Sequence, residues 1–288
     1  MPIDATVALD APPLVREVSW TDRDVLLYHL GIGAGASATD PKELRYTYER
    51  DLQVLPSFAT VVGGGVVGEG GLNALPGLKL DLKAVLHGGQ EVVVHRPIPA
   101  QGTAIASSGV SAVYDKGKAA VIVIESTAAL PDGTPLYASR NEIFVRGEGG
   151  FGGDRGPTTA FPPPDRAPEF VVERPTHPNQ ALLYRLSGDR NPLHAEPAFA
   201  AAAGFDRPIL HGLCSYGLVL KAAVDTCLGG ETTRVARYRG QFAGVFFPGE
   251  TMRVRIWQGP GTRLLVRATA ADRDDAPVLS NCTVEYHD

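Results

Sequence analysis

The sequence predicts an α+β protein of two similar halves, each an antiparallel sheet wrapped around a central helix. Three observations lead to this prediction. In the second half, one long apolar segment precedes four strand-like runs that turn residues separate. A segment rich in glycine and proline divides the chain near its middle. Finally, a short sequence from the first half recurs in the second.

The second half begins with two short helices and continues with a long one. A glycine at 188 suits the end of the first helix, and Pro197 suits the start of the second. The third is apolar nearly all round, which predicts a buried helix. We expect these helices at 179–187, 197–203 and 211–228, and strands at 233–242, 250–258, 263–271 and 278–286.

In the first half we expect a matching central helix at 49–62. Its strands are expected at 81–86, 90–95, 103–114, 119–129 and 137–145. The glycine runs at 63–65 and 68–71 do not lie between a strand and a helix start. We therefore interpret them as a flexible connection and not as a phosphate cradle.

The glycine- and proline-rich segment is interpreted as a linker between two domains. The domains are then 1–148, a non-catalytic half that accommodates substrate, the linker 149–168, and 169–288, the catalytic half. The alternative is a long surface loop within one domain. The sequence LLYHL at 26–30 recurs as LLYRL at 182–186, which indicates a duplication with an offset of 156 positions.

Composition restricts the classes of function. Hydrophobic residues make up 44% of the 288 residues and charged residues 20%, which predicts a soluble protein with a full core. A net charge of -5 with scattered basic residues predicts no nucleic-acid partner. No apolar run reaches the ~18 residues of a membrane span, so we expect no membrane partner. Three cysteines without CxxC spacing predict neither disulfides nor zinc, and a cytoplasmic location.

Asp189, Asn191 and His194 lie on one short loop ahead of the long helix. Addition of water beside a carbonyl needs one group to take a proton and another to supply one. An imidazole and a carboxylate can share these duties, and an amide can hold the water. A glycine–aspartate pair alone more often ends a helix, and an asparagine–proline pair alone more often forms an ordinary turn. The three side chains together predict a catalytic loop. With the 156-position offset, Asp189 falls on Gly33 and His194 on Ala38, so the first half lacks both groups.

Gly212 opens the long helix, where the first backbone N–H groups lack partners. A glycine there would let a thioester oxygen approach such an N–H as negative charge develops on it. The alternative is that Gly212 permits tight helix packing.

The runs 188–194 (GDRNPLH) and 208–212 (PILHG) resemble the hydratase 2 motif of the MaoC-like family, whose members are (R)-specific enoyl-CoA hydratases with the hot-dog fold. HGGQ at 87–90 resembles the family's HGxQ strand turn, and PGET at 248–251 its PGET turn. The resemblance implies a pseudo-symmetric double hot dog.

The resemblance further implies that Asp189 and His194 are the acid/base pair, Asn191 their helper and the N–H of Gly212 the oxyanion donor. Water would add syn to a trans-2-enoyl-CoA and give an (R)-3-hydroxyacyl-CoA, without a metal or redox cofactor. Coenzyme A enters as part of the substrate. Loss of the catalytic loop from the first half would leave room for a longer acyl chain.

The remaining candidates for contact with the substrate or its coenzyme A are Tyr184, His87, Gly88, Gly89, Pro208, Ile209, His211, Arg207, Arg237 and Arg239. The last two share one face of a strand by their spacing and could bind phosphate. A solvated strand face is the alternative.

Three other functions stay open at this point. The same residues would serve a dehydratase of (R)-3-hydroxyacyl thioesters on coenzyme A or acyl carrier protein. A hot-dog thioesterase would also use an acid and a helix-start donor, and a non-catalytic acyl-binding scaffold would use neither. The sequence does not decide acyl chain length or homodimer formation.

Overall fold

The computed structural model describes residues 3–65, 71–81, 83–158 and 161–288. Residues 68–70 of the second glycine run therefore lie outside the described residues. In the first half the helical elements are α1 (Ala5–Asp10), α2 (Asp22–Gly31), α3 (Pro41–Thr47), η1 (Pro56–Thr60), η2 (Val62–Gly64) and η4 (Leu72–Ala74). Its strands are β1 (Leu14–Trp20), β2 (Val85–Val94), β3 (Gly102–Asp115), β4 (Ala119–Ala129) and β5 (Pro135–Arg146).

The second half contains most of the expected elements. Its helical elements are α4 (Gln180–Tyr184), η5 (Arg185–Ser187), η6 (Pro192–His194), α5 (Pro197–Ala202), α6 (Gly212–Cys227), η7 (Thr232–Arg234) and η8 (Ala271–Arg273). Its strands are β6 (Phe170–Pro175), β7 (Val235–Phe242), β8 (Thr251–Gln258), β9 (Arg263–Ala270) and β10 (Ala276–Tyr286). None of the helices in these described stretches has the length and hydropathy of a membrane span.

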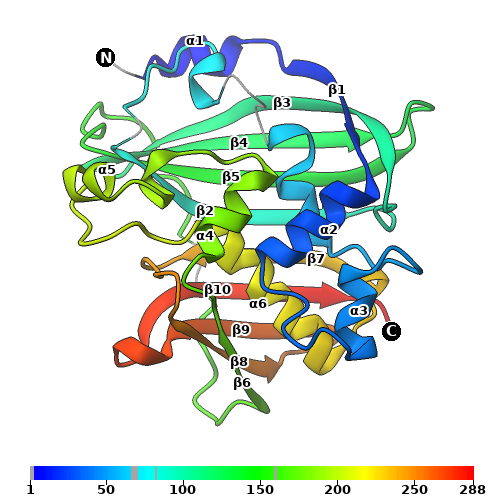
Figure 1. Cartoon of the computed structure of the whole chain (residues 1–288). Coiled ribbons are helices and arrows are strands. Elements are labelled where there is room, and N and C mark those ends of the chain that lie inside the picture. Colours follow the sequence, from blue (N-terminus) through cyan, green and yellow to red (C-terminus); the bar gives the residue numbers. More distant parts are fainter. Residues whose placement is uncertain (1–2, 66–70, 82, 159–160) are drawn as a thin grey trace.

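All strands form one antiparallel sheet of ten strands in the order β1-β3-β4-β5-β2-β7-β10-β9-β8-β6. The halves meet where β2 pairs with β7, with Glu91 opposite Arg239. Helices α2, α3, α4 and α6 lie on one face of this sheet (Figure 1). The prediction of an α+β protein with two sheet-and-helix halves is confirmed, and the halves share one continuous sheet.

The apolar face of the sheet carries a core that both halves build together. Buried residues of this core come from α2, η1 and β2 in the first half and from α4, α6 and β7–β10 in the second. Helix α6 supplies its centre, since Tyr216, Val219 and Val224 are fully buried. A second, smaller cluster joins β4 and β5 to α1 and the residues around η4.

The predicted central helix at 49–62 is wrong. Only η1 and the start of η2 form there, because Pro56 cannot donate a helical hydrogen bond and would interrupt a helix that began at 49. The prediction of separate strands at 81–86 and 90–95 is also wrong: β2 is one strand with a register shift between His87 and Gly89. The edge strands β1 and β6 were not predicted from the sequence.

The segment 149–168 contacts the sheet near both of its ends, within the residues that the structure describes. The carboxylate of Asp115 accepts hydrogen bonds from the backbone N–H groups of Gly150 and Gly152 at 2.8 and 2.7 Å. At the other end, the Trp257 indole donates to the carbonyl of Arg166 at 2.9 Å. A Cβ at Gly149 would lie 2.5 Å from the Ala119 nitrogen, so the glycine permits close contact with β4. The segment thus runs as an anchored strap.

Candidate active site

The loop from 188 to 194 follows directly on α4 and η5. Gly188 ends η5 with φ +127°, and a Cβ there would lie 3.3 Å from the Cα of Gly64 in the first half. Asp189 Oδ1 accepts a hydrogen bond from the Asn191 N–H at 3.0 Å, and Asn191 Oδ1 accepts one from the Leu193 N–H at 3.0 Å. The Asn191 side chain therefore shapes the turn that places His194.

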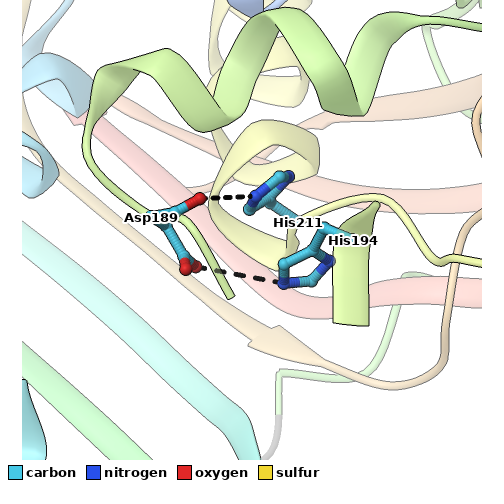
Figure 2. A group of neighbouring side chains, drawn as sticks. All are labelled: Asp189, His194 and His211. Carbon is cyan, nitrogen blue, oxygen red and sulfur yellow. Dashed lines mark hydrogen bonds and ion pairs between the residues drawn. The ribbon is translucent and has the colours of Figure 1, made fainter. Parts of the chain in front are cut away.

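His194 is buried and faces the Asp189 carboxylate, whose side chain is about half exposed (52%). Its Nδ1 lies 2.9 Å from the carbonyl oxygen of Ile209. Because a carbonyl only accepts, Nδ1 carries the hydrogen and Nε2 keeps its lone pair. That Nε2 points toward Asp189 Oδ2 at 3.9 Å (Figure 2). Burial lowers the pKa of His194, and the Asp189 carboxylate partly opposes that shift.

His211 precedes α6 and reaches the same loop from the other side. Its Nε2 lies 3.1 Å from the backbone carbonyl oxygen of Asp189 (Figure 2). Its ring stacks on that of His194, with centroids 3.7 Å apart, and lies 4.9 Å from the ring of Tyr184. Burial, and next the neighbouring His194, lower the pKa of His211 to about 3.

Gly212 is the first residue of α6, as expected. A Cβ at this position would lie 2.9 Å from the ring of Phe242 on β7. The close packing of the Phe242 ring therefore explains why position 212 is a glycine. Phe242 was not among the sequence candidates, because nothing local marks a strand residue that ends beside a helix start.

His87 lies on β2 of the first half, with its ring 4.7 Å from that of Phe242. Its Nε2 is buried and has no hydrogen-bond partner among the described residues. Burial lowers the pKa of His87 to about 4, while the Gly89 backbone and the Asp189 carboxylate oppose that shift. The expected strand turn at 87–90 is wrong, since Gly88 forms a bulge within β2 and a Cβ there would lie 3.1 Å from the Glu142 carbonyl.

The Ile209 carbonyl accepts the hydrogen bond from His194, and the Ile209 side chain belongs to the same small apolar cluster as Leu193 of the loop. Pro208 precedes Ile209 in the chain, and the Tyr184 ring lies 4.9 Å from that of His211. The three arginine candidates are each engaged elsewhere with carboxylates. Arg237 donates to both oxygens of Glu91 at 2.9 Å. In addition, Arg239 lies 3.8 Å from Glu142, and Arg207 lies 3.9 Å from Glu250.

Asp189, His194 and His211 offer ligand atoms within 4.8 Å of one another, which is close enough for a metal ion. The hydrogen bond from His211 Nε2 to a carbonyl places a hydrogen on that nitrogen. Coordination through this atom would require that bond to break, so in this arrangement Nε2 of His211 acts as a hydrogen-bond donor.

Two family models cover most of the chain. Residues 18–147 match the MFE-2 hydratase 2 N-terminal domain, and residues 160–267 match the MaoC-like domain. The chain is 50% identical to enoyl-CoA hydratase ChsH3 of Mycobacterium tuberculosis, over 97% of this chain and 98% of the relative. It belongs to the MaoC-like hydratase 2 family.

Two further members of this family extend the comparison. The peroxisomal enoyl-CoA hydratase 2 of Arabidopsis thaliana is 40% identical over 89% of this chain and 87% of its own length. The crystal structure of a MaoC-like dehydratase from Phytophthora capsici superposes with a TM-score of 0.88 at 31% identity, covering 99% of this chain and 98% of that chain. The double hot-dog fold expected from the sequence is confirmed.

Proposed function

We propose that this chain is an (R)-specific enoyl-CoA hydratase, a hydro-lyase that adds water to trans-2-enoyl-CoA and gives (R)-3-hydroxyacyl-CoA. The observation that carries the proposal is the unprotonated Nε2 of His194 facing Asp189 Oδ2 at 3.9 Å. One oxygen atom at about 2.8 Å from each would contact both groups. The identity to named enoyl-CoA hydratases supports the same reaction.

The reaction balances with these two groups alone. The oxygen of the water bonds to C3 while the Asp189–His194 pair takes one of its protons. As this bond forms, the electron pair of the C2=C3 double bond moves toward the thioester oxygen. The Asp189–His194 pair then delivers the proton to C2, which restores the thioester carbonyl and returns both groups to their starting state. The Asn191 side chain maintains the shape of the loop. The N–H of Gly212, at the start of α6, donates a hydrogen bond to the thioester oxygen and stabilises the negative charge that develops there.

The first half is proposed as the non-catalytic half that accommodates the acyl chain. At the place that corresponds to the start of α6 it has only the short η1, five residues long. Because the described residues of the first half form no long central helix, we expect more room for the substrate beside the sheet and therefore activity on long enoyl chains. Activity confined to crotonyl-CoA would contradict this part of the proposal. The three unpaired cysteines support a reducing compartment, and we propose the cytoplasm.

The test mixes the purified protein with trans-2-enoyl-CoAs of increasing acyl-chain length and follows the absorbance of the conjugated enoyl thioester. The wild-type protein should remove the band and form the (R)-3-hydroxy product. Asp189→Asn and His194→Gln should each slow the reaction by ~10²–10⁴-fold. Glu196→Gln and His177→Gln, two exposed positions of matched chemistry, serve as controls. No reaction at any chain length would refute the proposal.

The reverse dehydration is the second candidate, because the solved relative from Phytophthora capsici is a MaoC-like dehydratase. The same groups would then take the C2 proton and protonate the leaving hydroxyl. Assaying (R)-3-hydroxyacyl thioesters of coenzyme A and of acyl carrier protein side by side distinguishes the two substrate classes. Release of free thiol in either assay would instead indicate thioester hydrolysis.

A further inference from the structure

His211 is buried, and its hydrogen-bond geometry determines its tautomer. The carbonyl oxygen of Asp189 accepts at 3.1 Å from Nε2, so Nε2 carries the hydrogen. Nδ1 is then an acceptor, and it is buried without a partner among the described residues. A buried acceptor without a partner is destabilising, and a phenylalanine of similar shape would not incur that cost. A role for the donor at Nε2 accounts for histidine at this position.

The ring of His211 contacts two other rings. It stacks on His194 at 3.7 Å with 28° between the planes, and Tyr184 lies on it at 4.9 Å. The ring therefore limits how far the His194 imidazole can move. A charge on His211 would oppose proton uptake by His194, and burial lowers the pKa of His211 to about 3, which keeps it neutral near pH 7.

His211 also connects the two chemical parts of the site. It is the residue before Gly212, whose N–H opens α6, and it binds the backbone of the residue that carries the carboxylate. A shift of the loop relative to the helix would have to break this hydrogen bond or move the helix start.

We propose that His211 is a positioning residue that, as the Nε2–H tautomer, holds the Asp189 backbone and the His194 ring in register with the start of α6. This role rests on the proposed hydratase function, and it differs from the substrate contact expected from the sequence. His211 acts through Asp189 and His194 and does not itself exchange protons with the substrate.

The test compares His211→Phe, which keeps the ring, with His211→Gln, whose side-chain amide restores a donor at similar reach. Misplaced reacting groups lower rates strongly, so His211→Phe should reduce kcat by about 10²-fold while KM changes less than about threefold. His211→Gln should recover about tenfold of that loss. His177→Phe, at an exposed position, should behave as wild type.

Three outcomes would overturn the role. A raised KM with unchanged kcat would make His211 a substrate contact, full activity of His211→Phe would show that the donor is dispensable, and equal loss in both variants would exclude the hydrogen bond as the cause. Nitrogen chemical shifts of the wild-type histidines provide a readout that needs neither a variant nor a substrate. His211 should remain the Nε2–H tautomer through the neutral pH range, and an Nδ1–H tautomer would refute the proposal. An inactive wild type would defeat the hydratase assignment but leave this readout unaffected.

Discussion

The two stacked histidines, His194 and His211, donate hydrogen bonds to backbone carbonyls from different ring nitrogens. His194 donates from Nδ1 to Ile209 and His211 donates from Nε2 to Asp189, so only His194 presents a free lone pair to the carboxylate. Two neighbouring imidazoles therefore differ in which ring nitrogen carries the hydrogen. The difference arises from where the carbonyls lie, and side-chain identity alone does not reveal it.

At Gly212 the structure predicts that an added methyl group meets Phe242. Gly212→Ala should lower the free energy of unfolding by about 1–3 kcal/mol, because the ring lies 2.9 Å from the new Cβ. Gly212→Ala combined with Phe242→Leu should regain most of that loss. Urea unfolding of the two single variants and the double variant measures the effect. Additive losses in the double variant would show that the two residues do not conflict.

At the residue scale the sequence was sufficient for part of the site. Asp189 and His194 could be selected as candidates because they lie five positions apart on one loop, and the structure brings their side chains to 3.9 Å. Phe242 and the Ile209 carbonyl were missed, since a strand end and a backbone oxygen carry no local signal. Arg237 and Arg239 were selected by their spacing on a strand, and the structure pairs them with the carboxylates of Glu91 and Glu142 on neighbouring strands.

At the scale of elements, the long helix of the second half could be predicted and its first-half counterpart could not. The segment from 211 to 228 contains no proline, whereas Pro56 interrupts the segment from 49 to 62. The repeat at 26–30 and 182–186 did correspond to structure. Helices α2 and α4 carry Tyr28 and Tyr184 at equivalent places, and their ring centroids lie 6.1 Å apart.

Helix α6 is joined to α3 of the first half by a buried ion-pair cluster. Lys221 Nζ donates to Glu43 at 2.8 Å and to Asp225 at 2.7 Å, and the Tyr46 hydroxyl donates to Asp225 at 2.8 Å. The Lys221 side chain is only 6% exposed. This cluster connects the helix that begins at the site with the other half.

Removal of the lysine should leave two carboxylates without their cation. Lys221→Met should therefore lower the free energy of unfolding by about 3 kcal/mol, measured by urea unfolding. Arg263→Met is the matched control, because its partner Glu285 lies at the surface and such pairs contribute about 1 kcal/mol or less. An equal loss of unfolding free energy in the two variants would show that burial does not strengthen the contribution of the Lys221 ion pairs.

At the scale of the whole molecule, buried neutral histidines should make the fold sensitive to acid. Burial lowers the pKa of His29 and of His87 to about 4 in the folded protein. The unfolded chain binds these protons near pH 6.5, so the stability that these two neutral histidines contribute is lost as the pH drops from about 6.5 toward 4. Each of the two should account for about 3 kcal/mol over that range.

Urea unfolding at a series of pH values measures this dependence. His29→Gln should reduce the difference in unfolding free energy between neutral and acid pH by about the share of one histidine, about 3 kcal/mol. His95→Gln, at an exposed site, should leave that difference unchanged. A wild-type protein that is equally stable at about pH 4 and pH 7 would show that these imidazoles accept protons in the folded state.

The anchored strap at 149–168 has an evolutionary consequence. When two identical subunits form a sheet together, every mutation appears twice, and neither copy can lose a helix or a catalytic loop alone. Here one polypeptide contains two similar halves, so a mutation at Gly33 or Ala38 changes one half and leaves Asp189 and His194 of the other half as they are. Physical linkage by the strap thus frees each half to specialise while the common β2–β7 pairing preserves their joint architecture.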